Sequence, residues 1–267
     1  MRTGLIRIAA VIAGLGLAGA AAGCGDSGKE AANATNSGAG NAPSSAVAPP
    51  IDPGDGGKYA PEIDPSSFVD VIDNPYMPWA VGSRWVYEGK SDGEVERDVV
   101  RVTGHHKMIM GIDAVVVRDT VSVRGEIAED TYDWYAQDSE GNVWYLGEDS
   151  REYENGKAAD TAGSWEAGVD GALPGIVMPA DPRVGDAYRQ EYLAGEAEDM
   201  MQVLELGTSK KVKAGSYHDV IVTEEWTPLE PDVVEQKYWA RGVGNIGEVV
   251  ITGGTGSADL VEYTPGP

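Results

Sequence analysis

Short runs of β-branched and aromatic residues, separated by Gly, Asp and Asn, fill the chain from residue 61 onward. Runs such as "RWVYEG" from Arg84, "AVVVRDTVSVRG" from Ala114 and "DVIVTEEWT" from Asp219 largely alternate apolar and polar residues, as half-buried strands do. The gaps between runs are too short for crossover helices, so the strands should pair antiparallel. We therefore expect an all-β fold of about ten strands, in which antiparallel meanders form a barrel-like or sandwich structure.

The strand pattern occurs twice. Blocks of the first half are echoed in the same order about 103 residues later. "VGSRWVYEG" from Val81 corresponds to "VGDAYRQEYLAG" from Val184, and "YDWYAQDSEGNVWY" to "EQKYWARGVGNIGE", which aligns Gly141 with Gly244. The repeated order predicts two tandem related halves. We place them at residues 61–162 and 187–267, with a joining loop over residues 163–186.

The first residues of the chain read as an export signal. Arg2 and Arg7 precede an apolar run that ends in small residues before Cys24, the single cysteine of the sequence. The run is too short for a spanning helix. "AAGC" resembles the lipobox of bacterial lipoproteins, although Ala21 stands where Leu is usual. The resemblance implies a signal peptide over residues 1–23 and a lipid, such as palmitate, on Cys24; the alternative is an ordinary secretion signal with an incidental cysteine.

Residues 24–60 are rich in Gly, Ala, Ser, Asn and Pro and nearly free of large apolar side chains. Such a segment cannot bury enough surface to offset its ordering entropy, so we expect a flexible tether. The expected protein is exported and lipid-anchored to the bacterial cell membrane, facing outward or periplasmic.

The charge of the chain limits its partners. It contains 44 Asp and Glu against 20 Lys and Arg, a formal net charge of −24. This argues against nucleic acid and anionic lipid head groups, which would be repelled. A small ligand or a basic protein partner remains open, and so does a solubilising role for the acidic surface.

The segment Glu129–Asp149 crowds aromatic rings and carboxylates together and raises the question of a site. Asp138, Glu140 and Asn142 have the alternate spacing of a calcium loop, but the twelfth residue of that loop would be Asp149 instead of the usual Glu. We expect this segment to be a structural hairpin. The adjacent His105 and His106 point to opposite faces of a strand, and His218 lies in the other half. We therefore expect no metal site and no cofactor.

The joining loop over residues 163–186 is unusually long and apolar for a connection. Loops of this length are often functional. It either covers an open edge of the sheet or forms a lid over a ligand pocket. The candidate ligand-binding residues are Trp144, Trp165 and Met178.

Four stretches carry a family resemblance: "DNPYMPWAVGSRWVYEG", "YDWYAQDSEGNVWYLGED", "GSWEAGVDGALPGIVMPADPRVGDAYRQEY" and "TEEWTPLEPDVVEQKYWARGVGNIGEV". They resemble a family of β-rich bacterial exported lipoproteins over the range from about Asp73 to Val250, and more distantly TapB-type periplasmic β-proteins. The resemblance implies fold and location and supplies no catalytic residues.

No G-x-S-x-G elbow or local Ser, His and Asp set marks a catalytic site. The leading hypothesis is therefore a non-enzymatic envelope lipoprotein with a binding or structural role. One alternative is an exported hydrolase that uses acidic residues near the joining loop. Another is an acidic scaffold for a basic partner.

Overall fold

The structure is a computed structural model that describes residues 59–91, 93–161 and 163–267. The expected signal peptide, Cys24 and the tether up to residue 58 lie outside the described residues. Within the described ranges, no helix is long and apolar enough to cross a membrane.

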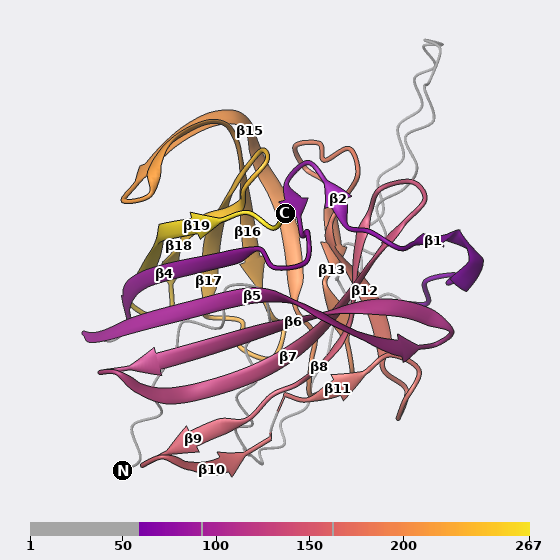
Figure 1. Ribbon diagram of the computed structural model, residues 1–267, viewed down its shortest axis with the longest axis horizontal. Coiled ribbons are helices and arrows are strands. Elements are labelled where there is room, and N and C mark those ends of the chain that lie inside the picture. Colours follow the sequence, from indigo (N-terminus) through magenta and orange to yellow (C-terminus); the bar gives the residue numbers. More distant parts are fainter. Residues whose placement is uncertain (1–58, 92, 162) are drawn as a thin grey trace, which may run out of the picture.

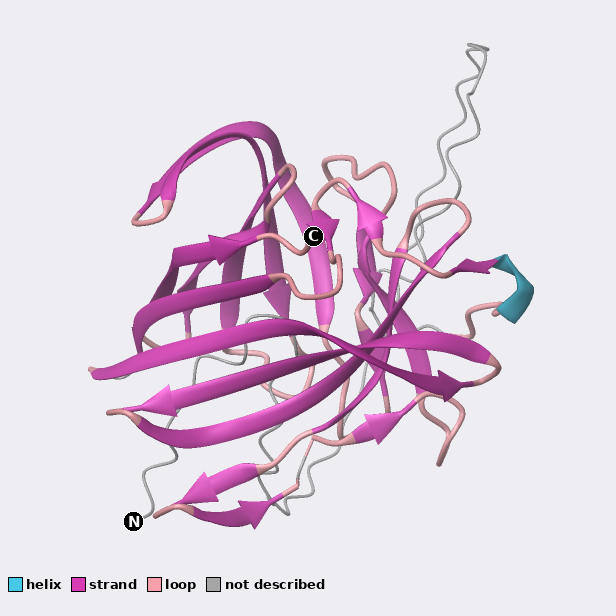
Figure 2. Cartoon of the chain, in the orientation of Figure 1, coloured by secondary structure: helices cyan, strands magenta, loops and turns pink. Residues whose placement is uncertain are grey.

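The described chain is almost entirely β, which confirms the expected fold class (Figure 2). Its one helical element is a 3-10 turn at Pro65–Ser67. The strands up to residue 160 are β1 (Phe68–Val69), β2 (Asp73–Asn74), β3 (Met77–Pro78), β4 (Arg84–Ser91), β5 (Glu94–Ile109), β6 (Ile112–Val123), β7 (Glu126–Asp138), β8 (Val143–Asp149), β9 (Glu152–Glu154) and β10 (Lys157–Asp160).

The later strands are β11 (Trp165–Glu166), β12 (Leu173–Met178), β13 (Ala187–Arg189), β14 (Glu191–Tyr192), β15 (Met200–Val212), β16 (Gly215–Trp226), β17 (Val234–Ala240), β18 (Gly244–Thr252) and β19 (Gly256–Thr264). The described residues thus contain more strands than expected, because many of them are two- to four-residue pairings that alternation in the sequence does not mark.

The long strands pair antiparallel in one continuous order: β15, β16, β17, β18, β19, β4, β5, β6, β7, β8 and β12. The last strand, β19, therefore pairs with the first long strand, β4. On the other side, β14 pairs with β12 and β13 pairs with β15, so the short β13–β14 segment spans the remaining gap. The sheet is nearly closed into a barrel (Figure 1).

Closure gives the sheet an inward face, here called the lumen, that is filled by large side chains. Tyr135 and Tyr145 stack on each other with ring centroids 4.6 Å apart, and Trp79 stands edge-on to Tyr135 at 4.6 Å. Trp85 and Tyr87 of β4 are also fully buried. Aromatic rings bury large areas and account for much of the packing in this core.

The β7–β8 and β17–β18 hairpins share a local irregularity. The pairing register shifts next to Gly147 in the first hairpin and next to Gly247 in the second, and both glycines have positive φ. Such a shift is a β-bulge, which bends and twists the pair. Gly147 and Gly247 therefore stand at the same place relative to the bulge of their hairpin. The pair aligned in the sequence differs, because Gly141 lies in the turn before β8 whereas Gly244 begins β18. The duplication of the whole unit stays a prediction.

The joining segment, residues 163–186, contains β11 and β12, both of which pair with β8. Pro174 and Gly175 are poor strand formers, so the sequence gives little strand signal there. Tertiary pairing overrides this low propensity. The backbone approaches so closely that a Cβ at Gly175 would lie 2.3 Å from the Gln190 carbonyl.

Replacing Gly89 with Ala tests the closing pair of strands. A Cβ at Gly89 would lie 2.2 Å from the carbonyl oxygen of Ser257 on β19, so β4 and β19 would have to separate. Overpacking of this kind costs about 1–3 kcal/mol, which urea denaturation would measure. Gly104→Ala in β5 is the matched control, because its Cβ would meet only Val81 Cγ1 at 3.8 Å. Equal denaturation midpoints for the two variants would contradict the closure.

Candidate functional site

The acidic hairpin between β7 and β8 is held by its own hydrogen bonds. Asp138 Oδ1 accepts the backbone N–H groups of Glu140 and Asn142 at 3.0 and 2.9 Å. Its Oδ2 accepts the Asn142 side-chain amide at 2.9 Å and the Trp144 indole N–H at 2.8 Å. Both carboxylate oxygens of Asp138 thus accept hydrogen bonds from protein groups, and these bonds stabilise the turn. Over the described ranges, no group of three or more His, Cys, Asp or Glu is arranged to hold a metal ion.

Two of the candidate residues lie around this hairpin. Trp144 is buried, with its ring edge-on to Phe68 at 6.3 Å. Met178 is buried on β12, opposite Val143 of β8. Neither residue lines the pocket described below.

Trp165, the third candidate, lies on β11 opposite Glu148 of β8. Its side chain is 4% exposed. Its ring meets Tyr145 in a T-shaped contact, with centroids 5.2 Å apart. Trp165 therefore anchors the joining segment to the core and covers part of the β8 edge.

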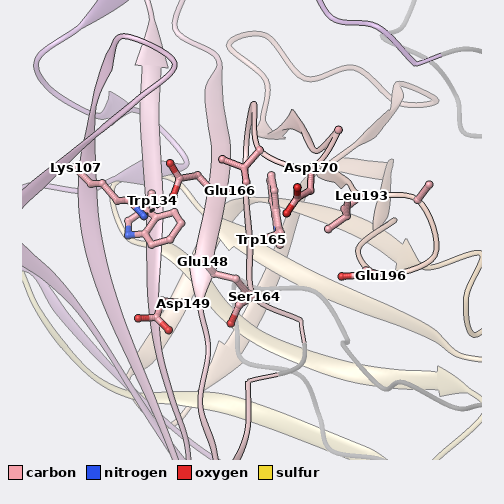
Figure 3. A pocket seen from close by; sticks show the side chains of 13 residues that line it. Lys107, Trp134, Glu148, Asp149, Ser164, Trp165, Glu166, Asp170, Leu193 and Glu196 are labelled. Carbon is pink, nitrogen blue, oxygen red and sulfur yellow. Dashed lines mark hydrogen bonds and ion pairs between the residues drawn. The ribbon is translucent and has the colours of Figure 1, made fainter.

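A pocket of about 670 Å³ opens beside Trp165 (Figure 3). One wall comes from β5, β7 and β8, a second from the joining segment between Ser164 and Gly171, and a third from the turn after β14. Figure 3 shows Lys107, Trp134 and Glu166 on one side, with Asp170, Leu193 and Glu196 across from them. The charged lining residues are one lysine, Lys107, and five carboxylates, Glu148, Asp149, Glu166, Asp170 and Glu196.

Lys107 makes two contacts at the wall of this pocket. Its Nζ lies 3.2 Å from the centre of the Trp134 ring and 2.8 Å from Glu166 Oε2. An ammonium over an indole face is attracted by the ring quadrupole, and the carboxylate adds a charge-assisted hydrogen bond. This corner therefore provides an aromatic face and a carboxylate to a primary ammonium.

Glu148 links the pocket to the lumen. Its Oε2 lies 2.8 Å from the Tyr145 hydroxyl, which also lies 2.9 Å from Asp133 Oδ1. Burial raises the pKa of the Glu148 carboxyl well above its usual value, and the charge of Asp133 adds to this rise. Burial likewise raises the pKa of Asp133, with a further contribution from Asp119.

The histidines do not converge. His106 Nδ1 lies 3.3 Å from Asp113 Oδ2 at the surface, and His218 Nδ1 lies 2.9 Å from Ser209 Oγ on β15. His105 is exposed.

Of these pocket-lining residues, Trp165 was a candidate from the sequence, whereas Lys107 and Glu166 were not. A ligand-binding role for Trp165 stays a prediction. The ion pair of Lys107 and Glu166 joins residues 59 positions apart. It depends on how the β5–β6 hairpin bends toward β11, and a register shift between Val102 and His106 interrupts the strand period just before Lys107. The chain carries no local signal for this contact. Trp134 and Tyr135 are adjacent on β7 and therefore point to opposite faces of the strand.

No protein-family model and no curated protein matches the chain. A solved structure that resembles it is the crystal structure of "a putative lipoprotein" from Parabacteroides distasonis, at 11% sequence identity. The alignment covers 73% of this chain and 100% of that chain, with a TM-score of 0.39. At that score the likeness carries no argument about the site.

Trp165→Ala tests whether Trp165 is a structural plug. Removing a buried large aromatic side chain costs about 3–5 kcal/mol, so urea denaturation should show a large loss of stability. Val169→Ala is the control from the same segment, because Val169 is 47% exposed and its truncation should cost less than about 0.5 kcal/mol. If Trp165→Ala were as stable as Val169→Ala, the segment would be a lid instead.

Proposed function

We propose that this protein is an exported, lipid-anchored binding protein whose β domain takes up a small ligand in the pocket beside Trp165. The apolar run and the "AAGC" sequence support export and lipid attachment at Cys24, facing outward or into the periplasm. The Gly-, Ala- and Pro-rich residues 24–60 would let the domain reach away from the membrane.

The charge of the pocket lining is the observation that carries the proposal. Lys107 is paired with Glu166, and Asp149 is paired with Arg151 at 3.3 Å. Asp170 and Glu196, across the pocket, form no ion pair with any residue that the structure describes. Since carboxylates attract a cation and the whole chain is strongly negative, a ligand with a positive group is favoured.

The chemistry of the proposed ligand follows from the contacts of Lys107. A primary ammonium is already bound there by an indole ring and a carboxylate. A ligand amine placed near Asp170 and Glu196 would find carboxylates of the same kind, and Leu193 and Val169 offer apolar surface beside them. The proposed ligand is a small organic molecule with at least one protonated amine, such as a polyamine or an amino sugar.

Binding of spermidine, glucosamine and neutral glucose, measured by calorimetry, tests this proposal. We expect the two amines to bind and glucose to bind weakly or not at all. Loss of a charge-assisted contact costs about 1.5–3 kcal/mol, so Asp170→Asn should weaken amine binding by about 10- to 150-fold.

Asp70→Asn is the matched control, because Asp70 is an exposed aspartate that does not line the pocket. It should bind the amines as the parent does. Equal binding of glucose and glucosamine, or an Asp170→Asn variant that binds both amines like the parent, would contradict the proposed ligand class.

Cys24→Ser tests the anchor. A lipid on Cys24 would be the chain's hydrophobic attachment after signal cleavage, so the variant should move from the membrane fraction to the soluble fraction. The β domain should stay folded, since its described strands begin at Phe68. Cell fractionation with Asp70→Asn as control measures the change. A variant that remains in the membrane pellet would rule out lipidation at Cys24.

A further inference from the structure

Buried carboxyl groups greatly outnumber buried cations in this protein. Over the residues that the structure describes, two cationic side chains are buried, Arg189 and Lys237. The buried carboxyl side chains are Glu96, Asp98, Asp119, Asp133, Asp138, Glu148, Glu191, Glu225, Glu235 and Glu248. A buried carboxylate needs a hydrogen-bond donor, a counter-charge or a proton. Asp138 has donors, as described above, but several of the others do not.

We propose that the lumen is a proton-binding site, in which Asp133 and Glu148 share one proton, Asp98 and Asp119 share another, and release of these protons destabilises the closed sheet. Glu148 also lines the pocket beside Trp165, but the proposal does not depend on the proposed ligand function.

The first pair is assigned by the hydrogen-bond capacity of Tyr145. Its hydroxyl lies 2.9 Å from Asp133 Oδ1 and 2.8 Å from Glu148 Oε2. A tyrosine hydroxyl has a single proton and can donate it to one of them. The other contact is a hydrogen bond only if that carboxyl carries a proton and donates it to the tyrosine oxygen. The three groups together therefore hold one proton beyond that of the hydroxyl.

The second pair is assigned by the scarcity of donors. Asp98 of β5 and Asp119 of β6 are buried. Within the described residues, no side chain donates a hydrogen bond to their four carboxyl oxygens, and the one backbone donor that acts on Asp119, the Thr120 N–H, makes only a weak contact. Their carboxyl groups are in contact with each other. One shared proton converts this contact from a repulsion between like charges into a hydrogen bond, as in other carboxyl pairs.

The groups that face the Asp98–Asp119 pair supply no unpaired cation. Tyr87 faces it from β4, Glu129 from β7 and Glu248 from β18. Both Glu248 oxygens are also buried without a donor. The ammonium of Lys237 on β17 acts on Asp119. It is bound 2.6 Å from Glu225 Oε2.

The groups that face the Asp133–Glu148 pair are acidic as well. Glu129 and Asp119 face it from β7 and β6, and Glu191 faces it from β14. Glu191 in turn lies beside Asp199. Burial raises the pKa of Asp199 to about 7, against the opposing charge of Lys237. The carboxyls thus form a connected set, in which ionising one group raises the free-energy cost of ionising its neighbour.

The direction of the pH effect follows from this arrangement. Burial, reinforced by neighbouring carboxylates, raises the pKa of Asp98 well above its usual 3.8 and raises that of Asp119 as well. The native state therefore binds more protons than the unfolded state above about pH 4, and stability falls as the pH rises through the native pKa values. This trend is opposite to ordinary acid denaturation, in which carboxylates favour the folded state when ionised.

Urea denaturation of the full chain between pH 4.5 and 8.5 tests the proposal. Each proton released changes the folding equilibrium by up to tenfold per pH unit, so two protons give a loss of up to about 100-fold per unit. Repulsion among surface carboxylates would also weaken the fold as pH rises, but salt screens it. The measurement is therefore made in about 0.5 M NaCl, where the Debye length is only a few ångströms. Stability that rises or stays constant with pH in this salt would overturn the proposal.

Asp98→Asn distinguishes the pH dependence of stability that comes from the lumen carboxyls from that of the other titratable groups. The amide permanently supplies the donor that the shared proton supplies to Asp119. The pH dependence should become shallower by about one proton, up to tenfold per pH unit. Asp70→Asn, at an exposed aspartate, should leave the pH dependence unchanged. A parental slope in Asp98→Asn, or the same shallower slope in both variants, would contradict the assignment.

Infrared spectroscopy of the parent tests the proposal even if Asp98→Asn does not fold. The carbonyl band of a protonated carboxylic acid is separate from the bands of carboxylates. We expect this band in the native chain at pH 7 and its loss when urea unfolds the chain at the same pH. A native spectrum without the band would overturn the proposal.

Discussion

The antiparallel pairing of β19 with β4 is the interaction on which the rest of the structure depends. It joins Gly256–Thr264, near the chain end, to the first long strand, Arg84–Ser91. Together with the β13–β14 crossing, it turns an open meander into a nearly closed sheet. Alternate residues of every long strand then face a lumen instead of water. An open sheet would leave the same polar side chains solvated.

Closure also divides neighbouring residues of one strand between two environments. On β7, Trp134 faces outward beneath Lys107, while Asp133 and Tyr135 are completely buried in the lumen. The outer environment forms the pocket beside Trp165, where amine chemistry is accessible. The inner environment holds buried carboxyls with few buried cations to stabilise their charge. Glu148 belongs to both, because it lines the pocket and touches Tyr145.

The sequence predicted the parts of this protein that local patterns determine. Alternation and turn residues marked the long strands, because half-buried strands require that pattern. β11 and β12 were missed, since Pro174 and Gly175 are weak strand formers that pair with β8 only in the tertiary structure. Trp165 was identified from the apolar content of its segment. The lumen carboxyls could not be, because acids are so numerous in this chain that none is marked as inward-facing.

Potentiometric titration measures whether the closed sheet holds protons. The proton uptake of the native chain between pH 8 and pH 4 is compared with that of the same chain unfolded in urea. The native chain should bind at least two more protons than the unfolded chain near pH 6, because a raised native pKa means proton uptake on folding. A native chain that binds the same number of protons as the unfolded chain, or fewer, would contradict this expectation.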